Sequence, residues 1–174
     1  MLEKDYMGVF TFIFLICPTF EYNTTYRSWK YESDEDYIVI PCAPEHVEYW
    51  LKYVVKHCKG TNSLIILDDC ASSNSMKNRS SELVMLGFSA RHYGISTIVI
   101  TQQLTSIAKP YRDNLTKMAV FYNSDGDDMH MLFHKYLEGT TQEERASIKS
   151  TLKKQKYSRL EISLIHPYIH VIKA

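Results

Sequence analysis

Apolar runs without polar alternation recur along the chain, and segments of helical periodicity separate them. An unbroken apolar run is typical of a strand buried on both faces, as in a parallel sheet. Such runs predict strands over residues 10–16, 37–40, 64–67, 95–101 and 118–122. The last apolar residues predict a hairpin over 160–172 that turns near His166 and Pro167.

Amphipathic segments predict helices between most of these strands. Within residues 44–58, Val47, Leu51 and Val54 recur at helical spacing, and Pro44 suits a first helical turn. Further helices are predicted over 80–92, 125–137 and 141–154, with a shorter one over 106–117 that Pro110 interrupts. The Ser- and Asn-rich segment 71–79 predicts a flexible loop. This alternation favours an α/β fold, with a mostly parallel sheet, helices on both of its faces and a C-terminal β-hairpin.

Composition fits a single globular domain, residues 1–174. Hydrophobic residues make up 45% and charged residues 23% of the chain, which excludes a disordered protein. Lys+Arg and Asp+Glu both number 20, so the net charge is zero and nothing attracts the whole chain to nucleic acid. Contact with DNA therefore needs a local patch. The basic stretch 149–159 is either such a patch or a solvated helix face.

The cysteines and the N-terminal residues indicate an intracellular protein without membrane contact. The cysteines at 17, 42, 58 and 70 show no CxxC spacing and are expected to be reduced thiols. The apolar run 9–17 is shorter than the roughly 20 residues that span a bilayer. Glu3 and Asp5 precede it, unlike the basic start of a signal peptide.

Candidate chemistry lies where two predicted strands end. Asp68 and Asp69 follow the apolar run 64–67, and open α/β sheets bind ligands at the carboxyl ends of their strands. One acid can help to hold a hydrated Mg²⁺ while the other orients or deprotonates a water, as in a Walker B motif. The alternative is an acid that forms a turn or caps a helix.

Gln102 and Gln103 end the next strand along the chain. In a right-handed βαβ unit both carboxyl ends lie at the same edge of the sheet, so we expect these amides to face the same crevice as the acids. A glutamine there can hydrogen-bond both a water and a phosphate oxygen. Arg112 follows and could reach a neighbouring subunit's triphosphate as an arginine finger.

Several ordered segments together resemble a known family. They are Ile16-Cys17-Pro18-Thr19-Phe20 with Asn23 and Tyr26, Leu67-Asp68-Asp69-Cys70-Ala71, Arg91-His92-Tyr93-Gly94-Ile95-Ser96 and Ile100-Thr101-Gln102-Gln103. The chain resembles the poxvirus-type genome-packaging ATPases of the FtsK/HerA superfamily, which occur in large DNA viruses and in Maverick/Polinton elements. The resemblance covers roughly residues 10–122 and, more loosely, the closing hairpin.

The resemblance implies a RecA-like P-loop NTPase core that couples hydrolysis of ATP, with Mg²⁺, to the movement of double-stranded DNA. It implies a homo-oligomeric ring, capsid proteins as further partners, and a location in the virion or at a viral assembly site in the host nucleus or cytoplasm. By match, Asp68 is the Walker B acid on the Mg²⁺ side, acting through water, and Asp69 is the catalytic carboxylate. Gln102 is the polar sensor, Gln103 a nucleotide-contacting neighbour, and Arg112 a finger acting in trans.

One departure from the family changes the expectation for ATP binding. The family has a glycine-rich phosphate loop ending in Gly-Lys-Ser/Thr, and the chain shows none before residue 10, where Met1 to Lys4 resemble the end of the helix after such a loop. That loop supplies most of the grip on the triphosphate, so we expect weak or absent ATP binding by this chain alone. The chain is then either part of a longer ATPase or a catalytically dead remnant that binds only protein or DNA. A small α/β phosphate enzyme unrelated to motors is a further alternative.

Overall fold

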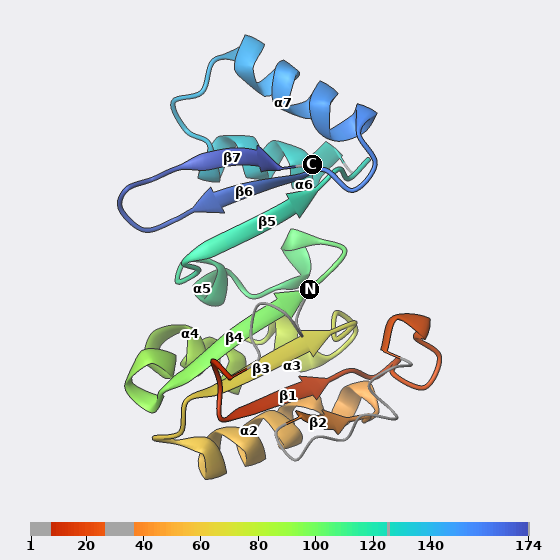
Figure 1. The fold of residues 1–174 in the computed structure, drawn as a ribbon, viewed down its shortest axis with the longest axis vertical. Coiled ribbons are helices and arrows are strands. Elements are labelled where there is room, and N and C mark those ends of the chain that lie inside the picture. Colours follow the sequence, from red (N-terminus) through yellow and green to blue (C-terminus); the bar gives the residue numbers. More distant parts are fainter. Residues whose placement is uncertain (1–7, 27–36, 125, 174) are drawn as a thin grey trace. The chain divides into compact units, whose positions relative to one another are not determined.

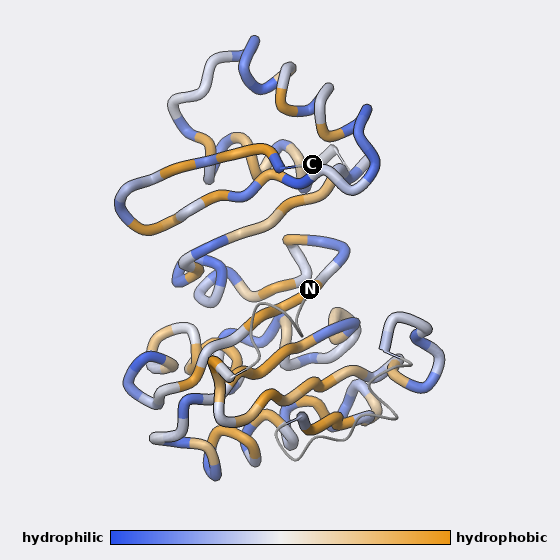
Figure 2. The backbone as a smooth tube through the Cα atoms, viewed as in Figure 1, coloured by the Kyte–Doolittle hydropathy of each residue, from blue (hydrophilic) through white to orange (hydrophobic). Residues whose placement is uncertain are grey.

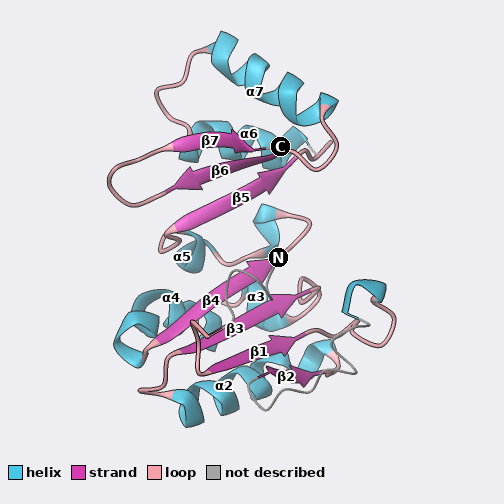
Figure 3. Cartoon of the chain, in the orientation of Figure 1, coloured by secondary structure: helices cyan, strands magenta, loops and turns pink. Residues whose placement is uncertain are grey.

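The structure, a computed structural model, describes residues 8–26, 37–124 and 126–173. The chain divides into two compact units, Met1–Asn114 and Leu115–Ala174. Figure 1 shows the elements of each unit, and Figure 3 shows the distribution of helices and strands. None of the described helices has both the length and the apolar composition needed to cross a bilayer.

The first unit is built on a four-stranded sheet with the strand order β2-β1-β3-β4. The strands are β1 (Phe12–Ile16), β2 (Tyr37–Ile40), β3 (Ser63–Asp68) and β4 (Ile95–Ile100), and all neighbours are parallel. Every residue of β3 is buried, as expected for a strand covered on both faces. The hydropathy colouring in Figure 2 shows this strand as an apolar segment in the middle of the sheet. The four predicted strands of this part of the chain are confirmed.

Chain direction decides which face of this sheet each connection covers. The steps from β2 to β3, through α2 (Val47–Cys58), and from β3 to β4, through α4 (Glu82–Tyr93), run the same way across the sheet. Right-handed crossovers therefore put both helices on one face. The step from β1 to β2 runs the other way, so the described part of its connection lies on the opposite face. There Phe20 and Tyr26 join a buried cluster with the strands.

Among the described residues, the two long helices of this unit lie on one face of the sheet. α2 and α4 contact each other on one face. The described part of the β1–β2 connection contains only one turn of 3₁₀ helix, η1 (Thr24–Tyr26). Among the described residues of this connection, the aromatic side chains of Phe20 and Tyr26 cover the sheet.

Two local predictions in this unit were wrong. The segment 71–79 contains the short helix α3 (Asn74–Lys77), because the Ser73 side chain accepts a hydrogen bond from the Ser75 amide and Met76 is buried. Pro110 does not interrupt a helix but lies in the first turn of α5 (Lys109–Arg112), where proline needs no amide hydrogen. The remaining short elements are η3 (Pro44–His46) and η4 (Leu104–Ser106).

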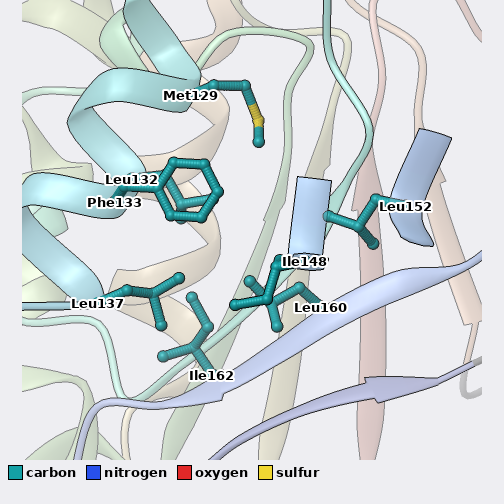
Figure 4. Packing of buried hydrophobic residues seen from close by; sticks show 8 residues of the cluster. All are labelled: Met129, Leu132, Phe133, Leu137, Ile148, Leu152, Leu160 and Ile162. Carbon is teal, nitrogen blue, oxygen red and sulfur yellow. The ribbon is translucent and has the colours of Figure 1, made fainter. Parts of the chain in front are cut away.

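The second unit is a three-stranded antiparallel sheet packed with helices. Its strands are β5 (Lys117–Phe121), β6 (Arg159–Ser163) and β7 (His170–Lys173), and its helices are α6 (Gly126–Met131), the π-helix η5 (Leu132–Tyr136) and α7 (Gln142–Lys154). The predicted hairpin is confirmed, and its turn contains the cis peptide His166–Pro167. Leu160 and Ile162 of β6 pack against Leu132 and Ile148 in the core of this unit (Figure 4).

Burial alternates along β5, which differs from the apolar run seen in the sequence. Met118 and Val120 pack toward the core of the second unit, while Phe121 is exposed. β5 pairs antiparallel with β6 and not with the parallel sheet. The apolar run predicted a strand correctly but not its partner.

Candidate functional site

The two acids meet at the carboxyl end of β3. Asp68 is the last residue of β3, and Asp69 follows with a left-handed backbone, φ 54°. In an extended strand consecutive side chains point to opposite faces, so a regular continuation would have separated the two carboxylates. The left-handed residue interrupts that alternation, and aspartate adopts this conformation more readily than most residues. As a result, one carboxylate oxygen of each acid and the Cys17 sulfur all lie within 4.8 Å of one another.

Tyr26 anchors the first acid. Its hydroxyl donates a hydrogen bond to Asp68 Oδ2 at 2.6 Å. The ring is only 6% exposed and stacks on Phe20, with 6.1 Å between centroids and 21° between planes. Leu64, Ile66 and Asp68 alternate along β3, so Asp68 points to the same face as the cluster that holds Tyr26. The segment after β1 therefore places the Tyr26 hydroxyl beside Asp68.

Thr19 anchors the second acid. It lies in the turn after β1, the strand next to β3, and Ile16 is the register partner of Leu67. The Thr19 hydroxyl donates to Asp69 Oδ2 at 2.6 Å. Cys17 Sγ is 3.5 Å from the same hydroxyl oxygen. One short segment after β1 thus contacts both acids.

The electrostatics follow from burial and from the closeness of the two carboxylates. Burial raises the pKa of Asp68, the Tyr26 hydrogen bond opposes that rise, and the Asp69 charge adds to it. Burial and the bond to Asp68 raise the pKa of Tyr26, so the phenol remains a protonated donor. Burial also raises the pKa of Cys17, which keeps the thiol neutral.

This donor set fits a hard divalent cation. Mg²⁺ prefers oxygen ligands, keeps several of its waters and is usually bound through one or two carboxylates together with substrate phosphates. Asp68 and Asp69 supply such oxygens, whereas the neutral Cys17 thiol is a poor ligand for Mg²⁺. Within the ranges that the structure describes, no other group of three His, Cys, Asp or Glu residues converges in this way.

The two glutamines lie at the same edge as the acids. Ile100, the last residue of β4, is the register partner of Asp68. Gln102 and Gln103 follow after Thr101, and both are exposed. The Gln103 carbonyl accepts a hydrogen bond from Ser106 Oγ at 2.6 Å, which fixes the turn into η4.

The two arginines lie at different places. Arg112 ends α5 and is half-buried within its own unit. Arg91 lies in the last turn of α4, before β4 begins, so it is at the amino edge of the sheet, opposite the acids. This position does not suit a role in chemistry at Asp68 and Asp69.

Sequence reasoning did not single out Thr19 and Tyr26 as site residues. Their partners are 50 and 42 positions away, so no local spacing pattern marks them. They did belong to the segment Ile16–Phe20 with Asn23 and Tyr26 on which the family resemblance rested, and that was the available signal.

Comparison with known proteins identifies the family. The family described as Poxvirus A32 protein matches residues 2–170, nearly the whole chain. The chain belongs to this family. The resemblance found in the sequence is thereby confirmed. A search of curated proteins gave no significant match.

Solved structures with the same fold are genome-packaging NTPases. The B204 genome packaging NTPase from Sulfolobus turreted icosahedral virus 2, in complex with AMPPCP, is 14% identical with a TM-score of 0.69, over 99% of this chain and 89% of that chain. B204, the DNA-packaging ATPase from Sulfolobus turreted icosahedral virus, is 16% identical with a TM-score of 0.70, over 97% of this chain and 84% of that chain. The structure of the first protein in complex with ATP-gammaS is 16% identical with a TM-score of 0.69, over 99% of this chain and 89% of that chain. The predicted fold, an NTPase core with a closing hairpin, is confirmed.

Proposed function

We propose that this A32-family chain is a DNA-packaging ATPase, in which the two units form one domain that couples ATP hydrolysis to translocation of double-stranded DNA. The observation that carries the proposal is the convergence of Asp68 and Asp69 at the carboxyl edge of a parallel sheet, each anchored by a hydroxyl group. Family membership supports it, as do structural neighbours that are packaging NTPases in complex with AMPPCP and ATP-gammaS.

The two acids take different parts in this proposal. Mg²⁺, when bound, neutralises charge on the β- and γ-phosphates. Asp68 holds that ion through water, and Asp69 orients the attacking water with the oxygen that Thr19 does not occupy. Gln102 senses the γ-phosphate from the end of β4, and Gln103 contacts the nucleotide beside it. Arg112 serves a neighbouring subunit of a homo-oligomeric ring.

One sequence observation favours a second candidate function. The 174 residues contain no Gly-Lys-Ser/Thr segment, so the usual phosphate cradle is not among them. A remnant that keeps the fold but binds only protein or DNA would have the same acids and no turnover.

DNA, as the proposed substrate, needs a basic contact surface. Lys149, Lys153, Lys154 and Lys156 are exposed on and after α7 in the second unit. Binding through these side chains to phosphates would weaken steeply with salt. Capsid proteins are proposed as further partners, and the virion or its assembly site as the location.

ATP turnover at the highest usable ATP concentration tests the proposal, because weak ATP binding is expected of this chain alone, and Asp69→Asn is the decisive variant. Removing a catalytic base costs about 10²–10⁴-fold in rate, so we expect at least a hundredfold fall in kcat with little change in nucleotide affinity. Glu138→Gln, at an exposed acid, is the matched control and should be silent. If Asp69→Asn keeps the turnover rate of the unmodified chain, Asp69 is not the catalytic carboxylate. Binding of a nucleotide without turnover by the unmodified chain would favour the remnant.

A further inference from the structure

The segment 17–26, which follows β1 and includes η1, holds both acids from outside the strand that carries Asp68. Two of its hydroxyl groups, on Thr19 and Tyr26, make hydrogen bonds of 2.6 Å to consecutive carboxylates. Each bond goes to the Oδ2 atom of a different acid, so the two bonds do not compete. The contacts form a matched pair in which each acid has one hydroxyl donor.

These two hydrogen bonds oppose the repulsion between the carboxylates of Asp68 and Asp69. Two carboxylates within 4.8 Å of each other repel, and each would swing away if nothing opposed it. A hydrogen bond from a neutral hydroxyl stabilises the charged form and fixes one oxygen in place. The second oxygen of each acid is then left for other partners.

Tyr26 is the more constrained of the two donors. Its ring is part of the cluster formed by Ile13, Leu15, Leu64 and Ile66, and Phe20 stacks on it. A ring fixed on several sides lets the hydroxyl point in few directions. Thr19, by contrast, is exposed and lies in a turn.

We propose that Tyr26 is a positioning residue for the metal side of the site: its hydroxyl holds Asp68 in the orientation that receives a hydrated divalent cation. The Thr19 hydroxyl likewise holds Asp69 in the orientation in which it receives the attacking water. This inference rests on the proposed function, because it assumes that Asp68 faces the ion.

The test is Mn²⁺ binding to the full chain. The electron paramagnetic resonance signal of free Mn²⁺ measures this binding, so no turnover is required. Losing a hydrogen-bond partner of a metal ligand typically costs about 10–100-fold in metal affinity. We therefore expect Tyr26→Phe to weaken Mn²⁺ binding about tenfold or more. Tyr22→Phe is the matched control, because Tyr22 is 89% exposed. Asp68→Asn reports whether the ion binds at this site.

Two further variants separate positioning from general loss of structure. Thr19→Val removes a hydroxyl from the same connection but from the other acid, and should leave Mn²⁺ affinity within about twofold, well short of the cost above. Phe20→Leu keeps every polar group but loosens the ring that stacks on Tyr26, and should weaken Mn²⁺ binding by less than Tyr26→Phe. Circular dichroism at the same temperature shows whether each variant is folded. Phe20→Leu therefore tests the proposal even where Tyr26→Phe does not fold.

The outcomes are distinct. Mn²⁺ binding that Asp68→Asn abolishes but that a folded Tyr26→Phe leaves unchanged overturns the positioning role and leaves the proposed function standing. Unchanged binding in folded Phe20→Leu, where Tyr26→Phe does not fold, likewise overturns it. No binding by the unmodified chain, or binding that Asp68→Asn does not affect, overturns the proposed function and this inference together.

Discussion

The hydroxyl of Thr19 and the carboxylate of Asp69 are 50 positions apart in the chain, and a 2.6 Å hydrogen bond joins them. Removing the hydroxyl with Thr19→Val should lower kcat for ATP about tenfold, because a hydrogen bond to a charged group contributes roughly 1.5–3 kcal/mol. Thr19→Ser keeps the hydroxyl and should retain most of the activity. The exposed Thr25→Val is the control. Equal rates for Thr19→Val and Thr19→Ser would show that the bond does not matter for turnover.

Asp68→Asn should stabilise the metal-free chain at neutral pH while it weakens function. The folded-state pKa of Asp68 lies above its ordinary value of 3.8, chiefly because of burial. The folded chain therefore binds this proton more tightly than the unfolded chain does. Stability from the group is fully present below pH 3.8 and is lost as the pH rises through the folded pKa. Asparagine avoids that loss and keeps an oxygen that can accept the Tyr26 hydrogen bond.

The measurement is the thermal midpoint of Asp68→Asn and of the unmodified chain in EDTA, from pH 7 down to pH 4. The variant should melt higher at pH 7, and the difference should shrink toward pH 4. Glu138→Gln, at an exposed acid, should show no such trend. A difference that stays constant with pH would contradict the raised pKa.

Gly94→Ala should destabilise the first unit more than Gly60→Ala does. Both glycines have positive φ, 66° and 85°, so alanine is strained at either position by about 1–2 kcal/mol. A Cβ at Gly94 would also lie 3.0 Å from the Thr61 carbonyl oxygen, whereas one at Gly60 meets nothing within 4 Å. Both tryptophans belong to the first unit, so their fluorescence during urea unfolding follows this unit. Equal costs would show that the contact with Thr61 adds nothing.

The strands of the first unit and the edge that carries the acids followed from the sequence, because a strand buried on both faces must be apolar throughout. β3 reads Ser-Leu-Ile-Ile-Leu-Asp, an apolar run that ends in the first of the two acids. The geometry of the acids could not be predicted in the same way. The bonds from Thr19 and Tyr26 join residues 50 and 42 positions apart, and no local pattern marks the left-handed backbone at Asp69.

Short elements escaped prediction for a different reason. α3 depends on a single cap at Ser73 and on the burial of Met76, which only the folded chain defines. The pairing of β5 depends on β6, about forty residues later in the sequence. Local periodicity predicts that a strand forms, but the choice of partner is made by tertiary packing.

Tyr26 contributes its ring to the hydrophobic cluster and its hydroxyl to Asp68. Packing and carboxylate orientation are therefore mechanically linked through one side chain. In a mutational scan, a smaller residue at Phe20 would register as a loss of activity, because Phe20 stacks on the ring that carries the Asp68 donor. Selection for tighter packing of this cluster would, for the same reason, also act on the orientation of Asp68.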